Sequence, residues 1–520
     1  MGLRIRLVEP APVGHNVYDL SRLPRLGLPL IATMLAEAGH DVRVYCEVLA
    51  APDLEDCLRA DLVGISSTTS TAPAAYRLAD LCARAGVPVV LGGPHVTFEA
   101  DEALGHAPYV VRGEGEATML ALVAHLETDA DLGGVPGLSY LGPDGEPRHN
   151  PARRRCSQEG FEQLPIPRLE LIVGHEKMAT KPVMTQWGCP FNCEFCSVSA
   201  MFSRAVRHRR ADQVVAELAG LDARRVFFYD DNFVVNKART STLLRAMIES
   251  GVTPEFFAQL RADAALRSLA HPDIDDDFLA LMRRAGGTMV MIGIEAVSDA
   301  ALAEMGKRQS VATIERAIDA FHRHGIAVHG MFVAGFDADT AESTEATVAF
   351  ARRLGIDTFQ LMVETPLPGT PLWSRVAAEG RLLSRDWSLF DGHHVVMRPA
   401  QMSPLELQLG VLEAMRDFYS WPRILSSGLV AALRHLPDLV RGESLALVGQ
   451  LPALARAAWS RRFEDVALAL QRGLPRETSE RVVRSLWLPA LRFYARRQLS
   501  ALEAQERARG HLAFLEALSA

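Results

Sequence analysis

The sequence lacks several features that would assign it to a common class of protein. It has 7 cysteines in 520 residues, and no stretch is long and apolar enough to span a bilayer. The run from Met1 to Pro10 lacks the apolar segment of a secretory signal peptide. The net charge of −8 argues against general nucleic-acid binding, so we expect no nucleic-acid partner. Few cysteines and no leader segment together indicate a cytoplasmic protein.

The composition is that of a well-cored globular protein. Hydrophobic residues make up 48% of the chain and charged residues 23%, and the length allows two to four domains. Four of the cysteines have no ligand-like neighbours, and we interpret them as small buried apolar residues; they are Cys46, Cys57, Cys82 and Cys156.

The other three cysteines, Cys189, Cys193 and Cys196, form a C-x3-C-x2-C run within one short loop. Three thiolates can hold three irons of a cubane iron–sulfur cluster and leave the fourth iron open to a substrate. A zinc site is the alternative. Structural zinc usually takes four ligands in paired short spacings, and no second Cys or His pair follows nearby.

The first part of the chain, residues 1–132, alternates strand-like and helix-like segments, which predicts a doubly wound parallel sheet. Small and polar residues follow three of its strands. Ligands of such sheets bind at the carboxyl ends of the strands, where small residues let a ligand approach the backbone. The alternative is that these loops are only tight turns. The residues that we expect at a binding edge are Ser66, Ser67, Thr69, Gly92, Gly93, His95, Gly113, Glu114 and Gly115.

A segment rich in glycine, proline and charge, residues 133–175, reads as a linker with a small hairpin around Pro143-Asp144-Gly145. Residues 176–400 then contain six strand-like runs separated by helices, which predicts an open partial barrel of the (βα)6 type. The first run, Val183 to Trp187, leads directly into the cysteine loop. The loop should therefore lie at the carboxyl end of the barrel, where the chemistry of such barrels takes place.

The final segment, residues 401–520, is helical by pattern and differs from the rest in charge. Residues 421–520 contain fifteen Arg, no Lys and nine acids, a balance of +6, so the remainder carries −14. Tryptophans lie among these arginines. One interpretation is a helical cap packed on the barrel, and the other is peripheral contact with an anionic membrane surface.

The cysteine run resembles the signature of the radical S-adenosylmethionine (radical SAM) superfamily, and Phe195 matches the aromatic residue before its third cysteine. The resemblance implies a [4Fe-4S] cluster, S-adenosylmethionine bound at the open iron, and a 5'-deoxyadenosyl radical. By position at the strand ends it implies S-adenosylmethionine contacts from Asp230, Asp231, Asn232, Arg261 and Glu295, besides Phe195. For any one of these side chains, helix capping or loop solvation is the alternative.

Residues 1–130 resemble the cobalamin-binding domain that precedes many radical SAM barrels. The matching stretches are Arg25 to Leu30, Leu91 to His95 and Val111 to Glu116. No Asp-x-His-x-x-Gly motif is present, so we expect cobalamin without a histidine ligand beneath the cobalt, and His95 as a loop residue.

The resemblance implies a cobalamin-dependent radical SAM enzyme that methylates an unactivated carbon of a small molecule or lipid, with a flavodoxin or ferredoxin as electron donor. One rival is a relative that cyclises or oxidises its substrate without methyl transfer, and another is a non-catalytic cobalamin or redox sensor. A methylthiotransferase would need a second cluster on N-terminal cysteines, and Cys46, Cys57 and Cys82 lack the required contexts.

Overall fold

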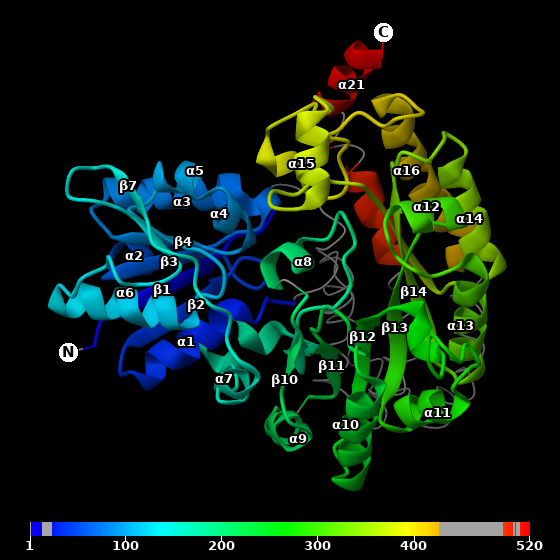
Figure 1. Cartoon of the computed structure of the whole chain (residues 1–520), viewed down its shortest axis with the longest axis horizontal. Coiled ribbons are helices and arrows are strands. Elements are labelled where there is room, and N and C mark those ends of the chain that lie inside the picture. Colours follow the sequence, from blue (N-terminus) through cyan, green and yellow to red (C-terminus); the bar gives the residue numbers. More distant parts are fainter. Residues whose placement is uncertain are drawn as a thin grey trace, which may run out of the picture.

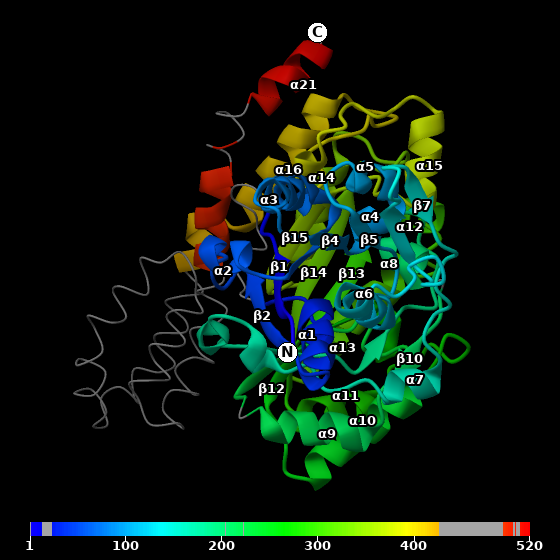
Figure 2. The ribbon, with the colours of Figure 1, turned by 90° about the vertical axis from the view of Figure 1, so that its left-hand side faces the viewer.

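The computed structural model contains two α/β domains and a helical extension, arranged side by side (Figure 1). It describes residues 2–12, 23–202, 204–221, 223–425, 492–502, 505 and 510–519. Figure 2 views the molecule from the side of the N-terminal domain, which lies in front of the second sheet.

The N-terminal domain is built on a seven-stranded sheet of order β2-β1-β3-β4-β5-β6-β7. The strands are β1 (Arg4–Glu9), β2 (Asp41–Cys46), β3 (Leu62–Ser66), β4 (Val89–Gly92), β5 (Tyr109–Val111), β6 (Leu138–Leu141) and β7 (Pro147–His149). The first five are parallel, and β6 and β7 add antiparallel to the edge. The hairpin expected in the linker is β6–β7, and it extends this sheet.

Helices cover both faces of the sheet, which confirms the doubly wound architecture. They are α1 (Gly27–Glu37), α2 (Leu54–Leu58), α3 (Ala72–Arg84), α4 (Pro94–Phe98), α5 (Ala100–Leu104) and α6 (Glu116–Thr128). Apolar residues of α1 and α6 form one core with the sheet, and those of α3 and α5 form a second core on the other face. Strands buried on both faces read as continuous apolar runs, which is why the sequence displays them clearly.

The second domain is an open parallel sheet of order β15-β14-β13-β12-β11-β8, as the sequence predicts. Its strands are β8 (Lys181–Val183), β11 (Arg225–Phe228), β12 (Glu255–Leu260), β13 (Gly287–Glu295), β14 (Ala327–Ala334) and β15 (Thr358–Val363). Its helices are α9 (Ala211–Gly220), α10 (Lys237–Glu249), α11 (Asp276–Arg284), α12 (Asp299–Glu304), α13 (Val311–Arg323) and α14 (Ser343–Arg353). Six βα units make a partial barrel rather than a closed one.

The first strand differs from its prediction. The sequence suggests one strand from Val183 to Trp187, but β8 ends at Val183, and β9 (Gln186–Trp187) pairs antiparallel with β10 (Arg207–His208). The backbone N–H groups of Thr185 and Gln186 donate to the carboxylate of Asp230 instead of to a neighbouring strand. The cysteine loop therefore grows out of a short hairpin above the barrel strand.

The C-terminal region is described only in part. Helix α15 (Pro371–Ala378), the 3-10 helix η6 (Trp387–Leu389), α16 (Pro404–Phe418) and α21 (His511–Ser519) are described, whereas most of the arginine-rich segment, residues 426–491, lies outside the described residues. Helix α16 packs on α14 and β15. Among the described helices we find none with the length and apolarity that crossing a membrane requires.

Close packing joins the two domains. Gly369, in the loop after β15, has a φ of +82°, and a Cβ at this position would lie 2.3 Å from the Phe98 ring of the N-terminal domain. The indole Nε1 of Trp387 donates to Glu102 at 2.8 Å. The barrel extension thus rests on α4 and α5 of the first domain.

We expect Gly369→Ala to destabilise the domain interface. The added methyl overlaps the Phe98 ring, and overpacking of this kind typically costs about 1–3 kcal/mol. Gly380→Ala is the matched control, because Gly380 also has a positive φ of +67° but a Cβ there meets nothing within 4 Å. Thermal unfolding should show a lower midpoint for Gly369→Ala than for the control. Equal midpoints would show that the contact with Phe98 does not matter.

Candidate functional site

The cysteine loop is held in place by a glycine. Gly188 precedes Cys189 and has a φ of +88°, and a Cβ there would lie 2.0 Å from the carbonyl oxygen of Ala205. Its N–H donates to the Asp231 carboxylate at 2.8 Å. No other residue type fits this conformation and this approach, so the start of the loop is fixed against the β10 side of the hairpin.

Asp230 supports the same loop from below. Its carboxylate accepts from the Thr185 N–H at 2.7 Å, the Gln186 N–H at 3.0 Å and the Thr185 hydroxyl at 2.6 Å. Burial raises the pKa of Asp230 to about 6, although the hydrogen bonds from Thr185 and Gln186 favour the charged form. Both carboxylate oxygens of Asp230, which we expect from the sequence to contact S-adenosylmethionine, therefore accept hydrogen bonds from Thr185 and Gln186 instead.

Asn232, by contrast, retains an unused acceptor. Its backbone carbonyl accepts from the side chain of Gln186, but its amide oxygen Oδ1 is buried and has no hydrogen-bond partner within the described residues. A buried polar atom without a partner is costly unless a ligand or water satisfies it. This oxygen fits a donor such as the ammonium group of S-adenosylmethionine, and the assignment stays a prediction.

The three thiols lie close to positive charge. Burial raises the pKa of the thiols of Cys189 and Cys193, and it raises that of Cys196 to about 12. Lys307 and Arg261 oppose this effect at Cys193, because a nearby cation favours a thiolate. Three thiols with two cations beside them fit an anionic iron–sulfur cluster held through these cysteines.

The three thiols are near enough to act on one another's pKa, but they are not arranged as the ligands of a single ion. Among the described residues, no group of three His, Cys, Asp or Glu side chains could hold a single metal ion. A cubane cluster does not require such convergence, since each thiolate binds a different iron.

The charges of Arg261 and Glu295 are paired within the chain. Arg261 stacks on the Phe191 ring at 3.7 Å and donates to the carbonyl of Lys307 at 2.7 Å. Glu295 forms an ion pair with Lys307 and has a φ of +68°. A non-glycine residue in this region costs about 1–3 kcal/mol, which is typical of functional sites. Both side chains border the cysteine loop, and direct contact with S-adenosylmethionine stays a prediction for each.

A salt-bridge network links the loop to the barrel extension. Arg375, on α15, donates to Glu194 of the loop at 2.9 Å and to Asp337 at 2.8 Å, and Arg381 pairs with Asp337 at 2.6 Å. Phe195 lies beside Phe336, with ring centroids 6.2 Å apart. The loop is therefore anchored from both sides, by Asp230 and Asp231 at its start and by Arg375 in its middle.

The three small-residue loops of the N-terminal domain meet at one edge of its sheet. Gly93 has a φ of +101°, and a Cβ there would lie 2.5 Å from the carbonyl oxygen of Ser67. The Gly113 N–H donates to the Thr97 hydroxyl at 3.0 Å. The hydroxyl of Ser67 and both ring nitrogens of His95 are buried without a hydrogen-bond partner in the described chain. This edge offers unsatisfied polar atoms and close backbone approach, as a cobalamin-binding edge requires.

Two of the residues expected at this edge contact the second domain instead. His95, expected as a loop residue, lies in α4. Its ring packs against Trp387 with ring centroids 4.9 Å apart, and burial lowers its pKa to about 4, so the ring is neutral. The Glu114 carboxylate forms an ion pair with Arg207 at 2.5 Å and accepts from the Cys156 N–H at 2.8 Å. These contacts leave cobalamin binding by either side chain as a prediction.

Several residues at the site carry no sequence signal of their own. Lys307, Arg375 and Trp387 belong to no motif and reach the site only through folding. Tyr229, which directly precedes Asp230, packs against the core of the N-terminal domain, and burial raises its pKa to about 12. Burial raises the pKa of Glu364 at the end of β15 to about 8, so this carboxyl is protonated at neutral pH.

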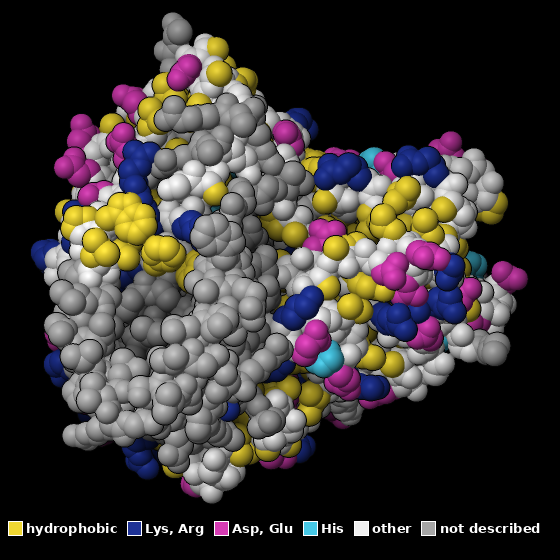
Figure 3. Space-filling model, turned by 180° about the vertical axis from the view of Figure 1, so that it is seen from behind, with side chains coloured by type: hydrophobic (Ala, Val, Ile, Leu, Met, Phe, Trp, Pro, Cys, Tyr) yellow, Lys and Arg dark blue, Asp and Glu magenta, His cyan; other side chains and the backbone are white. Residues whose placement is uncertain are grey.

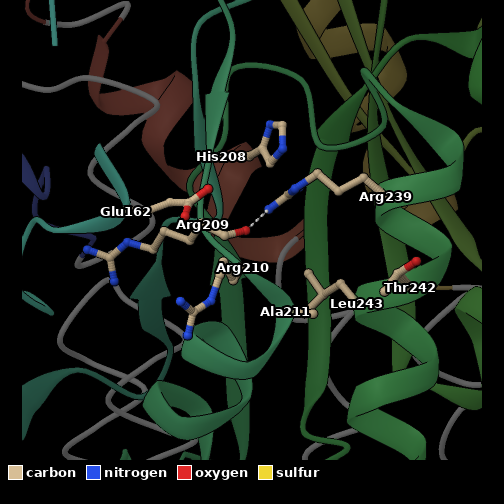
Figure 4. Close-up of a pocket in the computed structure, with 8 residues that line it drawn as sticks. All are labelled: Glu162, His208, Arg209, Arg210, Ala211, Arg239, Thr242 and Leu243. Carbon is tan, nitrogen blue, oxygen red and sulfur yellow. Dashed lines mark hydrogen bonds between the residues drawn. The ribbon is translucent and has the colours of Figure 1, made fainter. Parts of the chain in front are cut away.

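A pocket of about 230 Å³ lies outside the barrel, between the β9–β10 hairpin and α10 (Figure 4). Its basic side chains serve the chain itself: Arg209 pairs with the buried Glu217 at 3.0 Å, and Arg239 donates to the carbonyls of Thr185 and Arg209. We therefore assign the pocket a structural role in supporting the hairpin.

We expect Arg375→Ala to loosen the cysteine loop and speed cluster loss. Removing a partly buried charged hydrogen-bond pair costs on the order of 1 kcal/mol. The rate of iron release to a chelator should therefore rise several-fold. Arg353→Ala, which breaks a comparable ion pair with Glu315 on the barrel exterior, should leave that rate unchanged. Equal rates for the two variants would contradict the anchoring role.

Each of the two domains contains a segment that matches the model of a known protein family. The B12 binding domain model matches residues 19–123, and the radical SAM superfamily model matches residues 183–351. An uncharacterised methyltransferase of Pyrococcus horikoshii is 32% identical over 425 residues, covering 77% of this chain and 89% of the relative. The anaerobic magnesium-protoporphyrin IX monomethyl ester cyclase of Synechocystis is 28% identical over 445 residues, covering 79% and 84%.

Among solved structures, the cobalamin-dependent S-adenosylmethionine radical enzyme OxsB, with aqua-cobalamin and S-adenosylmethionine bound, superposes with a TM-score of 0.66. The match covers 99% of this chain and 83% of that one at 15% identity, so it shows a shared fold. The two domain matches and the methyltransferase relative place this chain in the family of cobalamin-dependent radical SAM enzymes, which use a [4Fe-4S] cluster, S-adenosylmethionine and cobalamin.

Proposed function

We propose that the protein methylates an unactivated carbon of a largely apolar small molecule or lipid. The observation that carries this proposal is the arrangement of the two sites in one chain. Trp387 and Arg207, both from the second domain, contact Glu102 and Glu114 beside the cobalamin-type edge. Arg207 also belongs to the hairpin that carries the cysteine loop. A methyl donor and a radical source bound at these two places would lie on either side of one domain interface.

The chemistry divides between cofactors and protein. When bound, the cluster and S-adenosylmethionine supply a radical that removes a substrate hydrogen, and cobalamin supplies the methyl group. Cys189, Cys193 and Cys196 would hold the cluster, and Asp231 and Arg375 fix the loop that carries them. The closely packed domain interface would exclude water from the reacting carbon.

The barrel interior supports an apolar substrate. Along β12 and β14 the side chains alternate between fully buried, facing the helices, and half-buried, facing inward. The half-buried side chains of β12 to β15, apart from those at the strand ends, are thioether, aromatic, aliphatic or uncharged polar groups; they include Phe257, Gln259, Met291, His329, Met331, Val333, Gln360 and Met362. Soft, uncharged side chains of this kind suit an apolar partner.

His329 is the most polar member of this group and is neutral. Burial lowers its pKa to about 4. Its ring nitrogens lie 2.8 Å from the Thr358 hydroxyl and 3.3 Å from the Gln360 side-chain oxygen. Because the ring is uncharged at neutral pH, it adds no positive charge that would favour a substrate carboxylate.

Transfer of labelled methyl tests the proposal. Reconstituted, reduced enzyme with methyl-labelled S-adenosylmethionine and an extract of its own organism should place label in an organic-soluble product and release 5'-deoxyadenosine. Cys193→Ala should abolish both, because the cluster loses one of three ligands, while Cys156→Ala should retain both.

The other outcomes separate the rival functions. Release of 5'-deoxyadenosine without label transfer would indicate cyclisation or oxidation, as in the cyclase relative. Neither product, from enzyme with cluster and cobalamin in place, would indicate a sensor. Label confined to a charged, water-soluble product would contradict the apolar substrate.

We also propose that the C-terminal region contacts an anionic membrane surface, which would bring an apolar substrate to the site. Trp421 and Leu425, at the end of the described part before residue 426, are 48% and 67% exposed. The arginine excess of the segment adds electrostatic attraction to anionic lipid. The alternative remains a helical cap packed on the barrel.

Exchange of these two side chains tests the membrane contact. The variant Trp421→Ser/Leu425→Ser should sediment several-fold less with anionic liposomes, since apolar insertion is lost. Leu269→Ser is the control, because Leu269 is 62% exposed on a barrel loop far away in sequence. Unchanged sedimentation of the double variant would favour the packed cap.

A further inference from the structure

Three exposed arginines lie in two segments of the chain that meet beside the end of α8 (Ser197–Phe202), the helix that follows the cysteine loop. Arg154 and Arg155 lie in the connection between the two domains, and Arg204 lies between α8 and β10. Arg155 donates from Nε and from a terminal nitrogen to the Met201 carbonyl, at 3.3 Å and 3.2 Å. The connection between the domains is therefore held against the end of α8.

This segment is continuous with the cysteine loop and folds back onto the start of the loop. Helix α8 begins at the residue after Cys196. The carbonyl of Ala205, next to Arg204, packs directly on Gly188, next to Cys189. Arg155, through the Met201 carbonyl, and Arg204, as the neighbour of Ala205, are thus joined to backbone that is continuous with Cys196 and Cys189.

The charge of this group, which we call the arginine face, is not neutralised locally. Within the described ranges, Arg154, Arg155 and Arg204 form no ion pair with an acid. On the rear of the N-terminal domain, by contrast, acidic and basic side chains are interleaved (Figure 3). Residues 1–420 carry a net charge of −14. The arginine face is therefore positive on a part of the chain that is negative as a whole.

We propose that the arginine face is the docking surface for a small acidic one-electron carrier protein of the flavodoxin or ferredoxin class. The inference rests on the radical SAM cluster, which must gain one electron from outside the chain. In that step the reduced carrier loses one electron and the cluster gains it; no bond forms or breaks and no proton moves. Opposite charge on the partners speeds and orients such encounters, and salt screens the effect.

The charge-reversal variant Arg154→Glu/Arg155→Glu/Arg204→Glu tests the proposal in the full-length reconstituted protein. Reduction of the cluster by reduced flavodoxin or ferredoxin, followed by absorbance and EPR, should slow at least tenfold at low salt, and the difference should shrink at high salt. Reduction by dithionite should be unchanged, because a small reductant needs no docking surface. No substrate is required, so the result is independent of the proposed methylation.

Two further variants keep the test specific. Arg154→Glu/Arg204→Glu leaves the hydrogen bonds of Arg155 in place and should still slow the carrier reaction several-fold. Arg84→Glu/Arg284→Glu/Arg316→Glu reverses three exposed arginines on α3, α11 and α13 and should not. Equal slowing by this control, equal slowing with dithionite, or an unchanged carrier rate would overturn the proposal. An unchanged carrier rate with loss of binding to anionic liposomes would reassign the face to lipid.

Discussion

The carboxylate of Asp230 is the interaction on which the site depends. Two backbone N–H groups and one hydroxyl converge on it, from Thr185 and Gln186. These bonds take residues 185–187 out of the barrel sheet and turn them into a hairpin. The cysteine loop begins where β9, the first strand of this hairpin, ends. Its position above the barrel is therefore set by a buried acid 45 residues further along the chain than Thr185. Charged hydrogen bonds in a buried setting are strong enough for this role.

Other carboxylates also hold the cysteine loop in place. The Gly188 N–H bonds to Asp231, and Glu194 bonds to Arg375. Each contact joins the loop to a different part of the barrel. A flexible run of cysteines is thereby restricted to one arrangement before any cluster binds, which lowers the entropic cost of assembling it. Acids that look like ligand contacts in the sequence are used here to hold the loop.

The two domains work as one unit because their functional edges are also their contact edges. Trp387 reaches the edge of the N-terminal sheet at His95 and Glu102, and Arg207 pairs with Glu114. Side chains that might be read as cofactor ligands therefore help to close the interface. The contacts of Trp387 and Arg207 thereby fix the distance between this edge and the cysteine loop.

The sequence by itself determined the fold class, both domains and the cofactor set. Three patterns carried this information: the periodic apolar strands, the small residues at strand ends, and the spacing of Cys189, Cys193 and Cys196. Each involves residues that are close in the sequence, so each can be recognised from the sequence alone. Only the tertiary structure decided which partner each polar side chain bonds to. Asp230 and Glu114 bond to partners about 45 and 40 residues away, and Lys307, Arg375 and Trp387 join the site from separate loops. Pairing of this kind depends on which strand ends meet in space, and the linear order of residues does not contain that information.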